Sequence, residues 1–276
     1  MDRNTTRRRS TALILVATGA LLFFSTACTC CWVPGAVTRA GSFGRAMPWR
    51  NWAVWPLGQV EAREEVGHSF DAAGPLALQL NVGVGEVQVR AGSGDRVEVR
   101  GTKHAWGANR AEAEARLREF RVDVRLAGAG TITVESDAPR AGEARSAMVD
   151  LVITLPRRAD VLATVNVGSL RVEGLEGTFD LTSNVGEVAA RDVALTGSSR
   201  LVSNVGEVTV RLPASASFEL DARSSIGDVS CGFPLQGEYA TSTLVGKRLS
   251  GRVGESPDVS LTLRVSTGDV RVERGK

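Results

Sequence analysis

Residues 183–190 read SNVGEVAA, and residues 203–210 read SNVGEVTV. Related stretches are SSIGDVSC (224–231) and VSTGDVRV (265–272), with looser copies VGVGEVQV (82–89) and VNVGSLRV (165–172). From Gly168 to Gly268 the central glycines are separated by 18, 20, 21 and 41 residues, the last being two periods. One turn of chain per about 20 residues is typical of a solenoid whose successive coils pair as strands about 4.8 Å apart.

The glycines are expected to mark the corners of the coils, because glycine takes a positive φ without a Cβ clash. The corner glycines are Gly85, Gly168, Gly186, Gly206, Gly227 and Gly268. Two and four residues after each corner the side chain is apolar, and alternate strand residues share one face. These columns are therefore expected to fill the core, and they include Val188, Val208, Val229, Cys231 and Val270. In such a position Cys231 serves as a small hydrophobe and not as a nucleophile or metal ligand.

An acidic side chain directly follows most corners and forms an outward column: Glu86, Glu187, Glu207, Asp228 and Asp269. Arginines stand five residues after three of the corners: Arg90, Arg191 and Arg211. Stacked carboxylates repel each other, so they must be solvated, splayed or bridged. Calcium is one candidate bridge, but one acid per coil and a long period favour a solvated face and no metal site. Two residues before the corners, Asn166, Asn184 and Asn204 predict a short amide ladder.

The N-terminus has the layout of an export signal. Basic MDRNTTRRRS precedes the uncharged TALILVATGALLFFSTA, which matches a charged region followed by an apolar one. The uncharged stretch continues to Thr38 and is long enough to span a bilayer. Arginines before it and none within it predict a cytoplasmic N-terminus. Residues 1–38 are therefore expected to be a signal peptide or membrane anchor that leaves the rest on the extracytoplasmic side.

Two outcomes stay open for this segment. Ser25-Thr26-Ala27-Cys28 resembles a bacterial lipobox, although Ser25 stands where leucine is usual. Cys28 is therefore a candidate lipidation site, and an uncleaved single-pass anchor is the alternative with the same topology. Residues 39–62 form a linker whose indoles either cap the solenoid or rest among lipid headgroups, namely those of Trp49, Trp52 and Trp55.

Residues 63–276 are expected to form a single all-β domain. Val, Gly, Ser, Thr and Arg recur in it, and aromatics make up only 5% of the chain. One stretch, NRAEAEARLREF at 109–120, is rich in helix formers and predicts a short amphipathic helix. Residues 1–28 hold four arginines and one aspartate, so 29 basic and 30 acidic residues remain elsewhere. This balance argues against nucleic-acid binding, which needs a basic footprint.

With the repeats in place, the chain resembles a known family. LPRRADVLATVNVGSLRVEGLEG (155–177), the two SNVGEV copies, LVGKRLSG (244–251) and LTLRVSTGDVRVE (261–273) are similar to the bacterial DUF4097 family of "putative adhesins". Related domains occur in envelope-stress proteins of the Lia type, where the fold is called a toastrack. The resemblance covers roughly residues 63–276. It implies a single-stranded right-handed β-solenoid, usually behind a membrane anchor, and no catalytic residues to carry over.

No constellation in the sequence predicts catalysis or a cofactor. The two histidines, His68 and His104, have no cysteine or recurrent carboxylate at ligand spacing. The pairs Gly83/Gly85 and Gly92/Gly94 are not followed by the lysine and the helix that a phosphate-binding loop requires. The leading expectation is a non-enzymatic, membrane-tethered solenoid that acts as an adhesin-like or scaffold surface and either self-associates or binds an envelope protein or glycan. An envelope-stress accessory protein is the alternative, and a glycan-active enzyme is a remote one.

Overall fold

The computed structural model describes residues 59–71, 75–128, 130–137, 146–242, 246–255 and 257–275. Residues 54–276 form one compact unit with its own hydrophobic core. The expected export segment, Cys28 and the tryptophans of the linker lie outside the described residues. Within the described ranges, no helix is long and apolar enough to cross a membrane.

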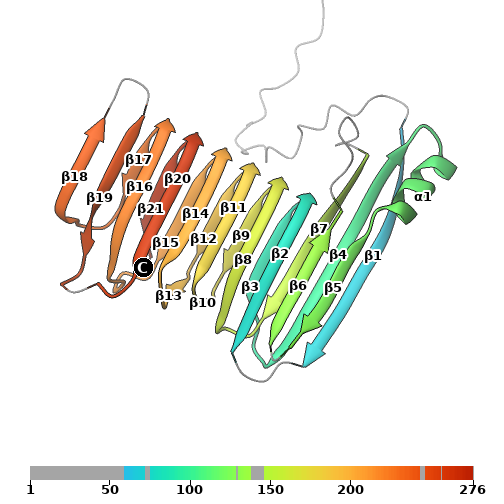
Figure 1. The fold of residues 1–276 in the computed structure, drawn as a ribbon, viewed down its shortest axis with the longest axis horizontal. Coiled ribbons are helices and arrows are strands. Elements are labelled where there is room, and N and C mark those ends of the chain that lie inside the picture. Colours follow the sequence, from blue (N-terminus) through green and yellow to red (C-terminus); the bar gives the residue numbers. More distant parts are fainter. Residues whose placement is uncertain are drawn as a thin grey trace, which may run out of the picture. The chain divides into compact units, whose positions relative to one another are not determined.

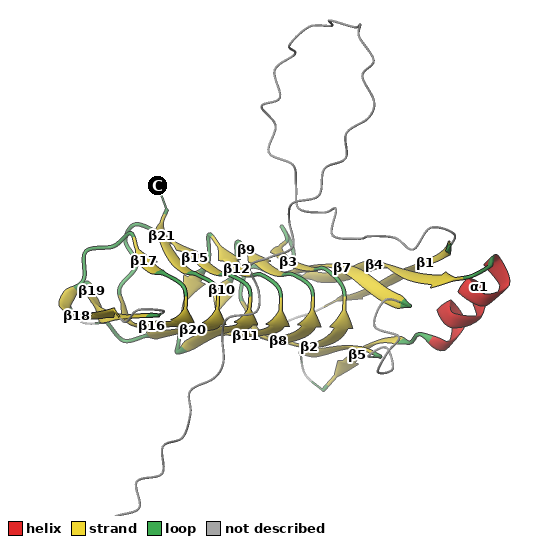
Figure 2. Cartoon of the chain, turned by 90° about the horizontal axis from the view of Figure 1, so that it is seen from above, coloured by secondary structure: helices red, strands yellow, loops and turns green. Residues whose placement is uncertain are grey.

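Two β-sheets face each other across the core (Figures 1 and 2). Sheet A, as described, has nine strands in the spatial order β1 (Val60–Asp71), β4 (Arg96–Gly107), β7 (Ala147–Leu155), β3 (Val87–Ala91), β9 (Leu170–Glu173), β12 (Val188–Arg191), β15 (Val208–Leu212), β21 (Val270–Arg274) and β17 (Val229–Cys231). Sheet B, as described, has ten: β18 (Gln236–Ser242), β19 (Lys247–Val253), β16 (Phe218–Ile226), β20 (Ser260–Thr267), β14 (Ser199–Val205), β11 (Phe179–Val185), β8 (Ala159–Val167), β2 (Leu76–Val84), β6 (Thr131–Ser136) and β5 (Val122–Ala127).

Each coil of the solenoid is a strand of sheet B, a glycine corner and a strand of sheet A. The coils so formed are β2–β3, β8–β9, β11–β12, β14–β15, β16–β17 and β20–β21. Strands of neighbouring coils pair in parallel and in register, so repeat positions stand side by side. A short third sheet, β10 (Glu176–Gly177) with β13 (Ala194–Leu195), lines the far side of two coils. The predicted all-β solenoid is confirmed.

The order of the coils in space follows the chain only in the middle. Coils β8–β9, β11–β12 and β14–β15 stack in chain order. The next coil in the chain, β16–β17, lies one place further out, and the last coil, β20–β21, fills the gap: Leu263 faces Leu201 on one side and Ala222 on the other. At the other end, β2–β3 lies between β7 and β9 in sheet A and between β6 and β8 in sheet B. The prediction that successive coils pair is therefore wrong at the C-terminal end. At the N-terminal end, β6 and β7 come between β3 and β8 in the chain but lie on the other side of the β2–β3 coil.

Antiparallel strands flank the parallel coils. At the N-terminal end β1 and β4 extend sheet A beyond β7, and β5 extends sheet B beyond β6. At the other end β18 and β19 extend sheet B beyond β16. The predicted short helix is confirmed as α1 (Arg110–Glu119), where the Asn109 side chain accepts a hydrogen bond from the Glu112 amide at 2.9 Å. The buried side chains of Ala113 and Leu117 hold this helix in place.

The corner glycines are needed for both conformation and space. All six have φ between +130° and +153°, a region that side chains with a Cβ rarely adopt. The coils also approach closely here. A Cβ on Gly186 would lie 1.9 Å from the carbonyl oxygen of Gly168, and one on Gly206 would lie 2.0 Å from that of Gly186. At each corner an added Cβ would meet the backbone of the neighbouring strand or coil, so the corner fits only because the glycine has no side chain.

The inward columns pack as one continuous core. Val188, Val208 and Val270 are fully buried, and Val229 is nearly so. Cys231 differs from its expected place in the core, because its side chain is only partly buried and packs against the core's edge. The reason is its strand: β17 ends sheet A, so Cys231 has a neighbouring coil on one side only.

Candidate interaction surface

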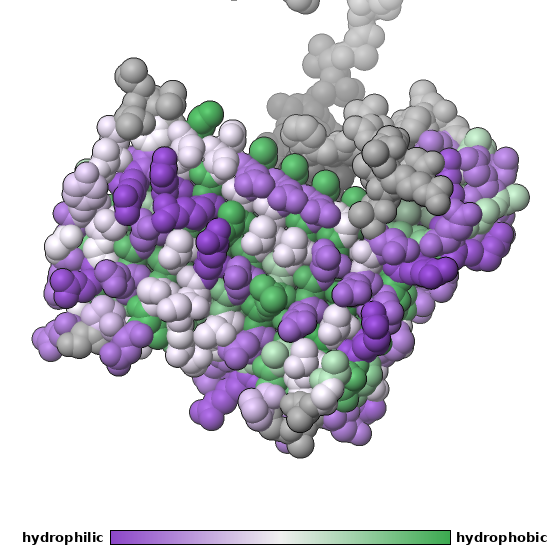
Figure 3. Space-filling view, in the orientation of Figure 1, coloured by the Kyte–Doolittle hydropathy of each residue, from purple (hydrophilic) through white to green (hydrophobic). Residues whose placement is uncertain are grey.

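The edge where sheet B turns into sheet A carries a row of exposed apolar side chains. Each stands directly before a corner glycine, and in-register pairing places Val167 beside Val185 and Val185 beside Val205. Their exposed fractions, and that of Ile226, lie between 42% and 54%. Thr267 continues the row between Val205 and Ile226. We call these four apolar residues, with Thr267, the ridge; Figure 3 shows apolar side chains spaced along this upper edge.

The periodicity of the sequence does not by itself identify the ridge, although the ridge residues recur at one position of the repeat. The apolar residue directly before a corner glycine stands three residues before the first inward residue of the next strand, as Val185 does before Val188. Strand alternation changes face at every residue, so the ridge residue does not belong to the core columns. Only its exposure in the folded corner shows that it points to solvent.

An amide ladder runs along one side of the ridge. The Asn184 side-chain nitrogen (Nδ2) donates to Asn166 Oδ1 at 2.7 Å, and Asn204 Nδ2 donates to Asn184 Oδ1 at 2.9 Å. The predicted ladder is therefore confirmed. Asn184, in the middle of the row, both donates and accepts, so the side chains of adjacent coils hold one another in place.

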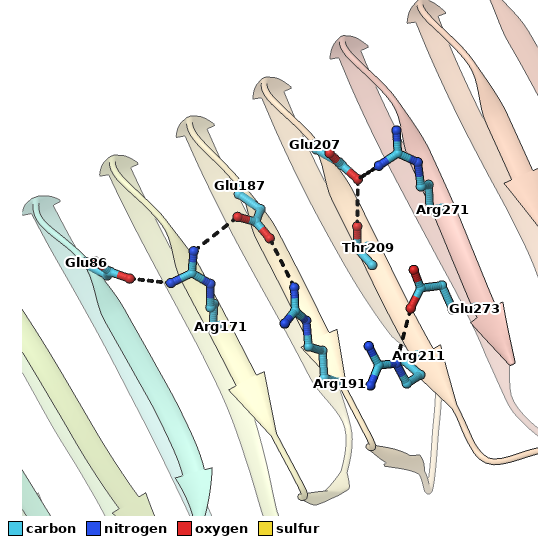
Figure 4. Close-up of polar contacts among 9 residues, drawn as sticks. All are labelled: Glu86, Arg171, Glu187, Arg191, Glu207, Thr209, Arg211, Arg271 and Glu273. Carbon is cyan, nitrogen blue, oxygen red and sulfur yellow. Dashed lines mark hydrogen bonds and ion pairs between the residues drawn. The ribbon is translucent and has the colours of Figure 1, made fainter. Parts of the chain in front are cut away.

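The acidic column runs along the other side of the ridge and is bridged by arginines (Figure 4). Arg171 lies between two carboxylates: it contacts Glu86 and also donates to Glu187 at 3.3 Å. Arg191 lies 3.8 Å from the other oxygen of Glu187. Glu187 is the most buried of these acids, with 18% of its side chain exposed.

The same arrangement recurs nearer the C-terminus. Arg271 contacts Glu207 and also donates to Asp269 at 3.2 Å, while Thr209 donates to Glu207 at 3.0 Å. Lys247 lies 3.1 Å from Asp228. The column thus stays in contact with solvent, as expected, but cations of the chain itself bridge it. Within the described ranges, no group of three His, Cys, Asp or Glu side chains is placed to hold a metal ion.

The two arginines that bridge carboxylates of the acidic column do not belong to the arginine column five residues after the corners. Arg171 and Arg271 stand three residues after their corners. Of the arginines five residues after a corner, Arg90 donates to the Thr154 hydroxyl at 3.2 Å, and Arg211 donates to Glu273 at the same distance. A guanidinium pairs with a carboxylate that its side chain can reach on a neighbouring coil. Which carboxylates are within reach depends on which coils are neighbours.

The cysteine and the histidines have structural surroundings. Burial raises the pKa of the Cys231 thiol, which disfavours a reactive thiolate. His104 contacts Glu61 at 2.7 Å and stacks on Trp106 with ring centres 6.0 Å apart. Arg63, and more weakly His104, lower the pKa of the Glu61 carboxyl against the opposing effect of burial. His68 stacks on Phe70 in strand β1.

Comparisons with known proteins agree with this architecture. A family model described as Toastrack DUF4097 matches residues 127–273, more than half of the chain. The crystal structure of a "putative cell adhesion protein" from Clostridium sporogenes has a TM-score of 0.57 at 14% identity, covering 78% of this chain and 100% of its own. At this identity the likeness shows the fold alone.

Two further crystal structures match less closely. A "putative adhesin" from Bacteroides fragilis has a TM-score of 0.25 at 12% identity, covering 76% of this chain and 97% of its own. A "putative lipid binding protein" from Parabacteroides distasonis has a TM-score of 0.27 at 7% identity, covering 77% and 97%. Scores this low carry no argument. The comparison with curated proteins gives no match.

Proposed function

The chain belongs to the toastrack DUF4097 family, and from this premise we propose that it is a non-enzymatic, membrane-tethered scaffold of the adhesin-like kind whose solenoid self-associates through the ridge. The observation that carries the proposal is the ridge itself. Apolar residues scattered singly on a surface need no explanation, but a contiguous row of them marks an interaction site. Here successive coils repeat the same exposed aliphatic side chain at the same corner.

A second copy of the chain fits the ridge better than an unrelated partner would. Two ridges with the same spacing between coils can meet side chain against side chain along their whole length. A twofold axis along the ridge would also place the amide ladder of each copy opposite the acidic column of the other. Amide N–H donors would then face carboxylate acceptors, a self-complementary arrangement typical of symmetric dimers.

The expected membrane anchor supports the same arrangement. A twofold axis along the ridge keeps the two solenoids parallel, and copies inserted in one membrane by their N-termini share an orientation. We accordingly propose an extracytoplasmic location for the solenoid, with residues 1–38 as the anchor or lipidated signal. The partly buried Cys231, whose thiol pKa is raised by burial, and the structurally engaged His104 fit a protein without catalytic chemistry.

Sedimentation velocity on residues 54–276 tests the proposal. We expect a concentration-dependent dimer that is lost in the double variant Val185→Thr, Val205→Thr, because threonine keeps the shape and strand propensity of valine but adds a hydroxyl. Leu162→Thr is the matched control, since Leu162 is equally exposed (49%) but lies on the outer face of sheet B away from the corners. A wild-type unit that stays monomeric at millimolar concentration would exclude self-association through the ridge.

A further inference from the structure

The outer face of sheet B holds a second feature, at the end formed by β14, β20, β16 and β19. Register places Arg264 of β20 directly opposite Arg223 of β16, and Arg223 directly opposite Arg248 of β19. Three guanidinium side chains thus stand side by side on three adjacent strands, about 4.8 Å from one strand to the next. Figure 3 shows strongly hydrophilic side chains gathered at this end of the face.

Like charges directly opposite each other on neighbouring strands destabilise a sheet, so the row needs compensation. Asp221 supplies part of it, because one of its oxygens accepts from Arg248 at 3.1 Å and the other from Arg264. Arg223, between those two arginines, has no ion pair with any described residue. Arg200 of β14 has none either, although Asp180 stands opposite it in register.

This differs from the outer face of sheet A. There, Arg171, Arg191, Arg211 and Arg271 each lie within 4 Å of at least one carboxylate. Arg90 of sheet A has no ion pair with a described residue either, but its side chain donates to the Thr154 hydroxyl. The side chains of Arg200 and Arg223 have neither an ion pair nor a hydrogen bond with a described residue, and both lie at one place.

That place is a shallow depression of about 410 Å³. Its lining holds three arginines and no acid: Arg200, Arg223, Arg264, Val202, Val265, Ser203, Ser225 and Ser266. Guanidinium groups bind oxyanions through paired N–H donors, and serine hydroxyls add further donors. The outward-facing Ser225 and Ser266 are exposed, so their hydroxyls are open to a ligand.

We propose that this depression is a binding site for a phosphate-type oxyanion, with Arg223 and Arg200 as its main ligands and Arg264 as the third. The row of arginines across β20, β16 and β19 suits a ligand with more than one phosphate group, because adjacent guanidiniums could each hold one. A free phosphate compound and a phospholipid headgroup share this chemistry. The arginines of the site are not part of the ridge, although Ser225 and Ser266 directly precede the ridge residues Ile226 and Thr267. Binding of an oxyanion by these guanidinium groups does not require self-association.

Isothermal titration of residues 54–276 with inorganic phosphate and with tripolyphosphate tests the site. We expect saturable binding, tighter for tripolyphosphate, that weakens at least tenfold in Arg223→Gln and in Arg200→Gln. Arg118→Gln is the control, since it removes the same charge from an exposed position on α1 far along the chain. Thermal unfolding checks that each variant is folded, which the exposure of Arg200 and Arg223 leads us to expect.

Cosedimentation with phosphatidylcholine vesicles, with and without 30% phosphatidylglycerol, separates the two sources of phosphate. Binding to the anionic vesicles alone, lost in Arg223→Gln, identifies a lipid headgroup; binding to tripolyphosphate, lost in the same variant, identifies a soluble phosphate. The proposal is overturned if neither probe binds. It is equally overturned if Arg118→Gln weakens binding as much as Arg223→Gln, because the effect would then be one of net charge.

Discussion

The middle of the solenoid and its C-terminal end are built from the same repeat but assembled differently. In the middle, each coil pairs with the coil that precedes it in the chain, as β12 does with β9. At the C-terminal end, β20–β21 is the last coil in the chain, yet it lies between β14–β15 and β16–β17. The middle is held by contacts between residues about 20 apart, such as Ser183 with Ser203. The end depends on pairs such as Ser203 with Val265.

The difference shows that the repeat specifies a coil but not the position of that coil. Every coil offers an open parallel edge with the same valine columns and the same glycine corner. The edge of β14 can therefore accept β16 or β20 by local criteria alone. The rest of the C-terminal segment favours β20. β19 pairs antiparallel with one edge of β16, so the edge of β16 that faces β14 is the one left for β20.

Removal of residues 256–276 should have the largest effect and would break the comparison outright. It deletes β20–β21, so β14, β15 and β16 lose the partner on one side, and β17, at the end of sheet A, loses its only described partner. Unsatisfied edges in the body of a sheet and the loss of the Leu261, Leu263 and Val270 side chains should abolish cooperative unfolding in urea. Circular dichroism and the urea transition are the measurements.

Deletion of the chain up to residue 74 is the control for that truncation. It removes β1, an edge strand whose described sheet partner is β4 alone, so a cooperative transition should remain. If the C-terminal truncation still unfolds cooperatively, then β16–β17 moves to pair with β14–β15 and the position of the last coil is not essential.

Gly186→Ala should cost less than that truncation but at least about 3 kcal/mol, because it combines an unfavourable positive φ with a backbone clash. The Cβ would lie 1.9 Å from the Gly168 carbonyl oxygen in the middle of the solenoid. Gly227→Ala makes the same change at the outermost corner, 2.2 Å from the Gly268 carbonyl. We expect the outer corner to relax more easily, with a loss nearer 2 kcal/mol.

Urea unfolding measures both losses, and Gly94→Ala is the control. An added Cβ at Gly94 meets no atom within 4 Å, so its stability should change by less than about 0.5 kcal/mol. Equal losses at Gly186 and Gly227 would mean that the end of the solenoid is as rigid as its middle.

The smallest effect concerns the bridging arginines. Arg171→Gln should destabilise by about 1 kcal/mol, because it leaves Glu86 and Glu187 without the guanidinium between them. Arg271→Gln should cost only a few tenths of a kcal/mol, since the Arg271 side chain is 48% exposed against 26% for Arg171. Urea unfolding at 0.05 M and 1 M NaCl measures both, and salt should reduce the difference. A larger loss for Arg271 would show that the bridge secures the inserted coil.

Much of the fold could be predicted from local patterns in the sequence. The valines two and four residues after each glycine indicate the buried face, and the helix formers of residues 109–120 indicate α1. The asparagine ladder was equally accessible, because three identical amides recur at one position of the repeat. The family resemblance added the toastrack fold, which the match over residues 127–273 bears out.

The candidate surfaces were less accessible. The sequence shows Val185 and Val205 as apolar, but only the folded corner shows that both point to solvent. It shows Arg223 as one of many outward arginines, but only the pairing of β16 with β20 and β19 places it between two others. Cys231 was expected in the core because its column is buried elsewhere, and the open end of sheet A leaves it only partly covered.

The SNVGEV repeats by themselves determined the coil: which side chains face inward, where the chain turns, and why the turn needs glycine. These properties depend on φ, on strand alternation and on residues within a few positions of one another. The tertiary structure alone decided which coils are neighbours, and with that the arginine bridges, the covering of Cys231 and the unpaired arginines of sheet B. The physical reason is that the coils are alike, so their local energies do not distinguish one stacking order from another. Contacts between residues about 60 apart make that choice.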